Sequence, residues 1–262
     1  MTGSSWIDAT RPSAARIYDY MLGGAHNFEA DRLAAAAMLE RFPDAAQAGH
    51  ANRDFLRRTV TCCCELGITQ FLDLGSGIPT AGNVHGIARR LRPEARVAYV
   101  DIEAVAVTHS RDVLAGDPLV SITQADLRDP ADVLAAPGVA ELLDFTRPVA
   151  VLAIAALHYV SHDENLPEIV AACRTALAPG SAFGMSHGSD DLDDPVAAHH
   201  MRELAAVMAQ SANPAYIRSR VELTQALSGL RLLEPGLVDI RRWRTSSELP
   251  DTAVYGALGI VE

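Results

Sequence analysis

The chain has 262 residues and a formal net charge of −11, with 49% hydrophobic and 21% charged residues, a composition that supplies ample material for a globular core. The negative charge argues against a protein whose main task is to hold phosphate backbones, and we therefore expect no nucleic-acid partner. All 22 basic residues are arginine, which excludes a pyridoxal-phosphate Schiff base, a Gly-Lys-Ser/Thr phosphate loop and a lysine general base.

The cysteines and the apolar runs bear on compartment and on metal binding. Cys62, Cys63 and Cys64 are adjacent on an expected helix and point in different directions, so they predict buried thiols and no metal site. The longest apolar run, Val149–Leu157, is too short to span a bilayer, and the N-terminus lacks the pattern of a secretory signal. We expect a soluble, cytoplasmic protein without a membrane partner.

The first 66 residues predict helices and no strand. Ser13 is a suitable N-cap for a helix that Gly23-Gly24 would end after Met21. An alanine-rich helix over 29–41 would stop at Phe42-Pro43, and a third helix over 45–66 would stop at Gly67. We therefore divide the chain into a helical cap, 1–66, and a second domain, 67–262.

From residue 68 onward, apolar runs alternate with helical patterns, which predicts an α/β fold with a mostly parallel sheet covered by helices on both faces. The expected strands are 69–74, 96–101, 119–124, 148–154 and 180–186. The expected helices are 80–92, 103–115, 131–135, 164–177, 195–211 and 220–228. Two runs near the C-terminus, 236–243 and 253–260, predict a closing pair of strands, on which Arg241–Arg244 would alternate between faces as a solvated edge.

Polar residues follow the ends of successive expected strands. Asp73 precedes the turn Gly75-Ser76-Gly77, whose glycines allow the backbone to approach a ligand closely. Asp101 ends the second strand, the position at which an acid holds ribose hydroxyls in a βαβ unit. Asp126 follows the third strand, and His158 follows the fourth. Because ligands bind outside the carboxyl ends of such strands, we expect these residues to surround one site.

A dehydrogenase shares this arrangement, and the glycine turn argues against it. The dinucleotide fingerprint G-x-G-x-x-G requires a third glycine where this chain has Thr80. The carboxylate of Asp73, placed directly before the turn, would also repel a pyrophosphate. A buried carboxylate at that position favours a ligand that carries a positive charge.

The glycine turn, Asp101 and Asp126 together resemble the S-adenosylmethionine pocket of class I, Rossmann-like methyltransferases. The segments 12–32, 51–56 and 77–85 are similar to a bacterial family of S-adenosyl methyltransferases, and the likeness covers essentially the whole chain. The resemblance implies a mostly parallel seven-stranded sheet that ends in an antiparallel hairpin, with S-adenosylmethionine as the cofactor.

The resemblance also implies which residues hold the cofactor. Asp73 would meet its ammonium group, Asp101 its ribose hydroxyls and Asp126 its adenine amino group, while Ile102 would cover one adenine face. The full expected set is Asp73, Gly75, Ser76, Gly77, Asp101, Ile102, Asp126, Leu127, Ala155, His158 and, from the cap, Asn27.

The catalytic residues are less defined, because methyl transfer depends mainly on the alignment of the acceptor with the methyl group. A base is needed only where the acceptor must lose a proton, and His158 and His187 are the candidates, with hydrogen-bonded or pocket-lining imidazoles as the alternative. The cap would close over the cofactor about Gly23-Gly24, with Arg32 and Arg53 reaching its polar end.

We therefore expect a methyltransferase that uses S-adenosylmethionine and acts on a small-molecule acceptor. The alternative is a regulatory protein that binds S-adenosylmethionine as a sensor without turnover, because no distinct catalytic constellation stands out. The sequence leaves the oligomeric state open, a homodimer included.

Overall fold

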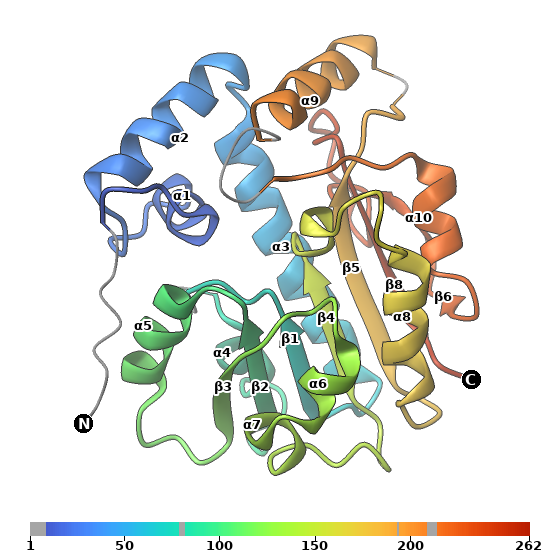
Figure 1. Ribbon diagram of the computed structural model, residues 1–262. Coiled ribbons are helices and arrows are strands. Elements are labelled where there is room, and N and C mark those ends of the chain that lie inside the picture. Colours follow the sequence, from blue (N-terminus) through green and yellow to red (C-terminus); the bar gives the residue numbers. More distant parts are fainter. Residues whose placement is uncertain (1–8, 79–81, 193, 209–213) are drawn as a thin grey trace.

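The computed structural model describes residues 9–78, 82–192, 194–208 and 214–262. One eight-stranded sheet runs through the molecule in the order β3-β2-β1-β4-β5-β8-β6, with β7 paired to β8 (Figure 1). The strands are β1 (Gln70–Leu74), β2 (Arg96–Asp101), β3 (Val120–Gln124), β4 (Ala150–Ile154), β5 (Ala182–Gly188), β6 (Arg231–Leu232), β7 (Val238–Asp239) and β8 (Val254–Ile260). Strands β1 to β5 are parallel, and β8 is antiparallel to β5. The predicted mostly parallel sheet is confirmed, although it has eight strands instead of seven.

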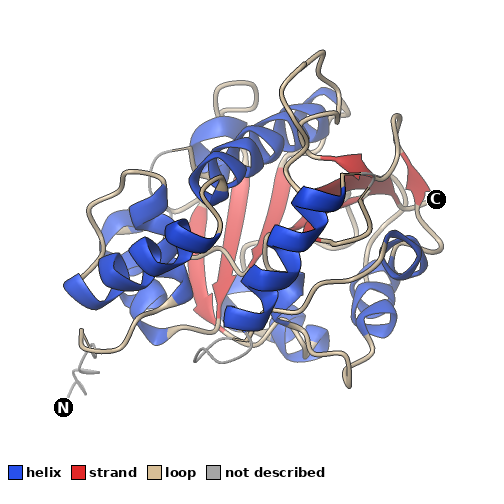
Figure 2. Cartoon of the chain, turned by 90° about the horizontal axis from the view of Figure 1, so that it is seen from above, coloured by secondary structure: helices blue, strands red, loops and turns tan. Residues whose placement is uncertain are grey.

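Helices cover both faces of the sheet, as Figure 2 shows from above. They are α1 (Ala14–Met21), α2 (Glu29–Arg41), α3 (Ala45–Glu65), α4 (Val84–Ala88), α5 (Ala104–Leu114), α6 (Pro130–Ala135), α7 (Pro137–Ala140), α8 (Leu166–Thr175), α9 (Pro195–Met208) and α10 (Arg220–Ala226), with a 3-10 turn η1 (Leu157–Tyr159). Alternate strand residues face opposite sides, so Phe71 and Tyr99 pack toward α3 and α4, whereas Leu72 and Val100 pack toward α6, α7 and α8. Among the described helices, none has the length and apolar character that crossing a bilayer requires.

The N-terminal helices α1 and α2 lie beyond the carboxyl ends of the strands, and α2 packs against α9 (Figure 1). Helix α3 begins among them and continues along one face of the sheet, where Phe55, Leu56 and Val60 are buried in the core. The division into a cap, 1–66, and a second domain, 67–262, stays a prediction. The C-terminal half of α3 belongs to the cap in this division, but it packs in the core of the sheet.

The segment 236–243 was expected to form a full strand, and that expectation is wrong. Only Val238–Asp239 pairs with β8, and the residues that follow turn away from the sheet. The Trp243 indole is fully buried and packs edge-on against Phe55 with 5.4 Å between ring centroids. The Arg58 guanidinium on α3 donates to the carbonyls of Trp243 and Ile240, at 2.9 and 2.6 Å. These contacts hold the backbone in a turn, so Arg241–Arg244 do not lie on a strand.

One helix start and one helix cap also differ from the prediction. The helix expected from residue 80 begins at Val84, because the Asn83 side chain accepts the Gly86 N–H at 2.8 Å and caps it there. Residues 79–81 lie outside the described residues. Ser13 does occupy the position before α1, but its hydroxyl donates to the Glu103 carboxylate instead of capping the helix. This bond ties the start of the cap to the loop after β2.

Candidate active site

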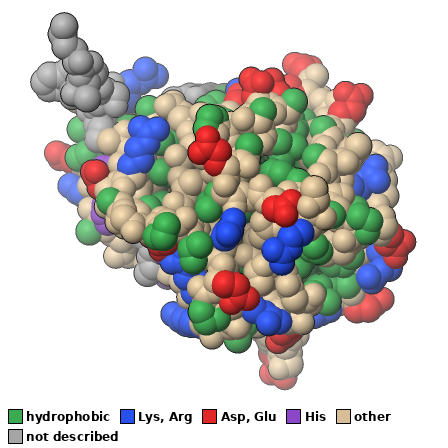
Figure 3. Space-filling view, turned by 90° about the horizontal axis from the view of Figure 1, so that it is seen from below, with side chains coloured by type: hydrophobic (Ala, Val, Ile, Leu, Met, Phe, Trp, Pro, Cys, Tyr) green, Lys and Arg blue, Asp and Glu red, His purple; other side chains and the backbone are tan. Residues whose placement is uncertain are grey.

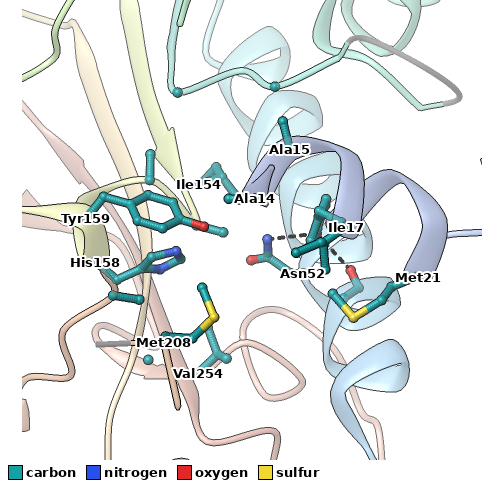
Figure 4. A pocket seen from close by; sticks show the side chains of 18 of the residues that line it. Ala14, Ala15, Ile17, Met21, Asn52, Ile154, His158, Tyr159, Met208 and Val254 are labelled. Atoms are coloured by element: carbon teal, nitrogen blue, oxygen red, sulfur yellow. Dashed lines mark hydrogen bonds between the residues drawn. The ribbon is translucent and has the colours of Figure 1, made fainter. Parts of the chain in front are cut away.

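A cavity of about 560 Å³ lies at the carboxyl ends of β1, β2, β3 and β4. The strand ends supply its floor, and α1, α2, α3 and α9 supply the remaining walls. Figure 4 shows His158 and Tyr159 on one wall and Asn52, Ala14, Ala15 and Ile17 on the facing wall. The size and the enclosure by several elements are typical of a small-molecule site.

The glycine turn after β1 forms part of the floor. Gly75 and Gly77 have φ angles of 67° and 61°, in the left-handed region that glycine occupies without strain. A Cβ on Gly75 would lie only 2.6 Å from the Ala156 Cβ. The amides of Gly75 and Ser76 donate to the Val100 carbonyl at 2.8 and 3.1 Å, so the turn is fastened to β2. The close packing of Ala156 thus leaves no room for a side chain at residue 75, and Gly75, Ser76 and Gly77 all line the cavity.

Asp101 lies at the end of β2 and lines the cavity, although its side chain is mostly buried. One carboxylate oxygen accepts the Gly77 N–H at 2.7 Å, and the other accepts the Glu103 N–H at 2.8 Å. Burial raises the pKa of Asp101, while these two backbone bonds act in the opposite direction. Each oxygen has a second lone pair, so the carboxylate can still accept hydrogen bonds from a ligand.

Asp73 lies two residues before the turn, beneath the cavity floor, and does not itself line the cavity. Burial raises its pKa to about 7, with the positive charge of Arg53 lowering it and the negative charge of Asp101 raising it. None of the described residues donates a hydrogen bond to this carboxylate. Arg53 lines the cavity and donates to the Gly82 carbonyl at 3.2 Å. The charge of Arg53, which lines the cavity, therefore acts on a carboxylate that is buried beneath the cavity floor.

Asp126 and Leu127 line the cavity where the chain leaves β3. The Arg128 Nε donates to both Asp126 oxygens at 2.9 Å, and Arg128 also reaches Glu164 at 3.2 Å. The hydrogen bond from Arg128 is the main reason that the pKa of Asp126 is lowered. Asp126 was expected here from the sequence, whereas Arg128, which lines the same cavity, was not.

The two candidate histidines have different environments. His158 lines the cavity, and its ring makes no hydrogen bond to any of the described residues. Burial lowers the pKa of His158 to about 4, with Arg218 contributing, so the imidazole is neutral at physiological pH. The ring packs against Tyr159, with 4.4 Å between centroids. His158 therefore presents a neutral imidazole to the cavity.

His187 is fully buried and does not line the cavity. Its Nδ1 lies 2.8 Å from the Gly188 carbonyl, and its Nε2 lies 3.3 Å from a nitrogen of Arg218. Because arginine can only donate, Nε2 must accept and Nδ1 must carry the ring proton. Burial and the neighbouring His158 lower its pKa to about 3. Both ring nitrogens are thus engaged, so the structure leaves only His158 in reach of a cavity ligand.

Asn27 of the cap does not line the cavity either. Its side-chain amide donates to Asp19 at 3.0 Å and to the Gly24 carbonyl at 2.9 Å. Arg32 in turn donates to the Asn27 side chain at 3.2 Å and does not line the cavity. Asp19, which was not expected at the site, does line the cavity. Of the three cap and α3 residues expected at the polar end, the structure brings only Arg53 to the cavity.

A chain of hydrogen bonds, not expected from the sequence, joins the strands β4 and β5 to the helices α3 and α1. Ser186 on β5 accepts the Ala155 N–H at 2.9 Å and donates to Asn52 at 2.6 Å. Asn52 donates to the Tyr18 hydroxyl at 3.2 Å, so β4, β5, α3 and α1 are connected. Ala155 itself lines the cavity with a φ of 55°, a strained value for a residue other than glycine. The signal in the sequence was Asn52, which with Thr59 is one of two polar side chains among the buried residues of α3.

The sheet order and the site define a class of protein. Parallel strands ordered β3-β2-β1-β4-β5 are closed by the antiparallel β8. A glycine turn follows β1 and an acid ends β2. Both line a cavity at the carboxyl ends of the strands. These features are those of a class I, Rossmann-like methyltransferase.

The comparisons with known proteins identify the family. The family model described as S-adenosyl methyltransferase matches residues 1–261, so the chain belongs to that family and its cofactor is S-adenosylmethionine. A crystal structure of a candidate methyltransferase from Thermobifida fusca YX is 36% identical, with a TM-score of 0.91 over 99% of this chain and 100% of that chain. A DUF574 family protein from Streptomyces avermitilis MA-4680 is also 36% identical, with a TM-score of 0.91 over 98% and 100%.

More distant matches support the fold alone. The S-adenosylmethionine-dependent methyltransferase SibL in its apo form has a TM-score of 0.54 at 16% identity, over 96% of this chain and 64% of that chain. A search of curated proteins finds no match. Family membership supports a transferase, and none of these comparisons supports the alternative of a sensor without turnover.

The residues present suit the cofactor. The turn at Gly75 and Gly77 presents backbone with no Cβ to obstruct a ligand. Asp101 has free lone pairs at the cavity surface, and the carboxylate of Asp73 has no hydrogen-bond donor among the described residues. A ligand with hydroxyl donors and a cationic group would satisfy both acids.

Proposed function

We propose that the protein transfers a methyl group from S-adenosylmethionine to a small-molecule acceptor bound in this cavity, with His158 taking the proton of the acceptor. The observation that carries this proposal is the neutral imidazole of His158 at the cavity surface, which makes no hydrogen bond to a described residue. An enclosed site of about 560 Å³ favours a small acceptor over a macromolecular one. On the face seen from below, acidic and basic side chains are interspersed, which gives no support to a nucleic-acid surface there (Figure 3).

The expected contacts of the cofactor follow from the positions of the charges. Asp101 would accept hydrogen bonds from the ribose hydroxyls through its remaining lone pairs. Asp73 and Arg53, beneath and beside the floor, would meet the ammonium and carboxylate groups. Asp126, oriented by Arg128, would accept from the adenine amino group. Asn27 would not contact the cofactor directly. It would influence the cavity through Asp19, which lines the cavity and accepts a hydrogen bond from the Asn27 amide.

The cofactor supplies a methyl group on a positively charged sulfur, which leaves as a neutral thioether. The acceptor atom forms the new bond to the methyl carbon while the carbon–sulfur bond breaks and its electron pair stays on sulfur. The acceptor must then lose its proton, and the neutral His158 can take it. The remaining walls hold the acceptor in line and exclude water, which is the larger part of catalysis in such a reaction.

The test is methyl transfer from radiolabelled S-adenosylmethionine to the components of a metabolite extract. We expect a labelled product with the wild type, and a rate lower by about 10²-fold or more with His158→Phe, the range that loss of a general base produces. Affinity for S-adenosylhomocysteine, measured by calorimetry, should stay within about threefold of wild type. The exposed His199→Gln on α9 is the matched control and should keep both properties.

The pH profile separates a base from a residue that only lines the pocket. Because burial lowers the pKa of His158 to about 4, kcat/KM should be level above this value and should fall as pH drops through it. A transfer rate that His158→Phe leaves unchanged would remove His158 from the mechanism. Absence of transfer to any component of many extracts would contradict the proposed function itself.

A further inference from the structure

Beyond His158 the cavity continues into a space walled by the cap and by α9. We call this space the methionine chamber, and it is lined by Met21, Met38, Phe42, Met201, Leu204 and Met208. In Figure 4, Met208 and Met21 border the space beside His158 and Asn52. Since the glycine turn and the strand-end acids Asp101 and Asp126 supply the polar part of the lining, the chamber is the part of the cavity left for the acceptor.

We infer that the acceptor is a neutral, largely apolar ring compound whose reacting group is a single hydroxyl. This inference rests on the proposed function and adds to it the chemical class of the substrate. It depends on three properties of the chamber, namely the charge of its walls, the number of its free polar groups and the chemistry of its side chains.

The walls of the chamber lack charge. Among the described residues that α2, α9 and the segment 214–217 contribute to the cavity, none is charged. Helix α9 keeps Met201 buried, whereas Arg202 and Glu203 of the same helix are exposed. Asp19 on α1 is turned toward its own loop. One of its oxygens accepts from the His26 N–H at 2.8 Å and from the Asn27 amide at 3.0 Å, and the other, which is buried without a partner among the described residues, lies 2.1 Å from the place that a Cβ on Gly24 would take. A charged acceptor would therefore lose its hydration in the chamber without gaining a partner.

The polar groups near the chamber are few, and most are already paired. Asn52 accepts from Ser186 and donates to Tyr18, and the Tyr18 hydroxyl lies 3.1 Å from the Gly49 carbonyl, to which it donates. The imidazole of His158 has no such bond to a described residue. One ligand hydroxyl can donate to this imidazole, and the Tyr159 hydroxyl, which makes no hydrogen bond to a described residue, lines the same cavity (Figure 4). Further polar groups on the ligand would lie against the apolar side chains of the chamber. The geometry thus favours one hydroxyl on an apolar skeleton.

The side chains of the chamber suit a bulky apolar ligand. Methionine is unbranched and polarisable, so it adapts to irregular apolar shapes and makes favourable contacts with aromatic rings. The chamber has such side chains on α1, α2 and α9, together with the ring of Phe42. These three helices enclose the acceptor, so a ring compound would be surrounded on several sides. The site is built to hold apolar surface and a hydroxyl next to His158.

The experiment compares matched ring compounds that differ only in the polar group. Binding of 2-naphthol and 2-naphthoate, and of 4-phenylphenol and 4-phenylbenzoate, is measured by calorimetry with and without S-adenosylhomocysteine, and methyl ethers are sought by mass spectrometry with S-adenosylmethionine. We expect at least one hydroxyl compound to bind tenfold or more tightly than its carboxylate partner, and to be methylated on oxygen.

Two substitutions on α2 locate the binding. Met38→Glu places a charge in the chamber and should weaken binding of the hydroxyl compound at least tenfold, while affinity for S-adenosylhomocysteine stays within about threefold. Leu33→Glu makes the same change on the same helix at a residue that is 65% exposed, and it should change neither affinity. Met38→Leu keeps the apolar wall and should retain binding if the charge, and not a folding defect, is the cause.

The outcomes separate this inference from the proposed function. Carboxylates that bind as tightly as their hydroxyl partners, no binding of either hydroxyl compound, or binding that Met38→Glu leaves unchanged would each overturn the chamber as the site of an apolar acceptor. Failure of the wild type to bind S-adenosylhomocysteine would instead contradict the proposed function. The arm without S-adenosylhomocysteine still tests the chamber in that case.

Discussion

Replacing Asp73 by asparagine should have opposite effects on stability and on cofactor binding. In the ligand-free protein, burial raises the pKa of Asp73 from 3.8 to about 7, because no described residue donates a hydrogen bond to it and Arg53 offsets only part of the burial. The ionised carboxylate therefore destabilises the free protein near neutral pH. The same charge would attract the cationic group of the cofactor.

The sign and size of the stability effect follow from proton linkage. A carboxyl group with a raised pKa in the folded state binds its proton more tightly there than in the unfolded chain, so its contribution to stability is lost as pH rises from about 4 to about 7. The difference between 3.8 and about 7 corresponds to about 4 kcal/mol, because one pKa unit equals about 1.4 kcal/mol. Asparagine does not ionise, so at pH 8 the free variant should unfold with a free energy higher than wild type by up to about 4 kcal/mol. Near pH 4 the two proteins should be similar.

The effect on the ligand has the opposite sign. A hydrogen bond or close contact to a charged group contributes about 1.5–3 kcal/mol, so Asp73→Asn should weaken S-adenosylhomocysteine binding by about 10- to 150-fold at pH 8. Unfolding in urea at pH 4.5 and pH 8 and calorimetric titration of the ligand measure the two effects separately. Asp54→Asn, at a residue that is exposed on α3, is the control and should change little.

One pattern of results would refute this reasoning. If Asp73→Asn were less stable than wild type at pH 8 and still bound S-adenosylhomocysteine with unchanged affinity, Asp73 would be a structural group with no effect on the cofactor. The expected result is that Asp73→Asn gains stability over wild type at pH 8 but not at pH 4.5, and binds S-adenosylhomocysteine more weakly. The charge of Asp73 would then favour ligand binding while it destabilises the free protein.

Two further substitutions test how the cap and the floor are built. Asp31 is buried, accepts the Arg16 Nε at 2.7 Å and joins α1 to α2, so Asp31→Asn should destabilise the protein by about 3–5 kcal/mol, measured by urea unfolding, and should weaken cofactor binding. Gly75→Ala would place a Cβ 2.6 Å from Ala156 at a φ of 67°, and the strain and overlap together should cost about 2–5 kcal/mol and reduce cofactor affinity. Gly82→Ala has a similar φ of 76° but no atom within 4 Å, so it should cost only about 1–2 kcal/mol, and an equal loss in both glycine variants would contradict the proposed overlap.

The parts of the fold that the sequence predicted well depend on local patterns. Helix α2 has the predicted bounds, 29–41, because an alanine-rich segment is stopped by Phe42-Pro43. The ends of β1 at Leu74 and of β2 at Asp101 are also where the apolar runs placed them. Because parallel strands bring their carboxyl ends to one edge, these local assignments were enough to gather Asp101 and Asp126 around one cavity.

The parts that could not be predicted depend on contacts between distant segments. His158 and His187 both follow apolar strands, but Arg218 occupies the Nε2 of His187 and leaves His158 as the cavity residue. The turn around Trp243 is held by Arg58, which is remote in the chain. The role of α9 as a wall of the cavity likewise arises from its packing against α2, for which the sequence carries no local signal.

The continuity of α3 limits how ligands can reach the interior. The C-terminal half of this helix is fixed to the sheet by Phe55 and by the two carbonyls that Arg58 binds, while its first turns already border the cavity. If the three N-terminal helices moved away from the sheet as one unit to open the cavity, α3 would have to break in its middle. We therefore expect exchange of substrate and product to use movements of the segment before Ala45 or of α9, the two parts of the cavity wall that are not continuous with the sheet.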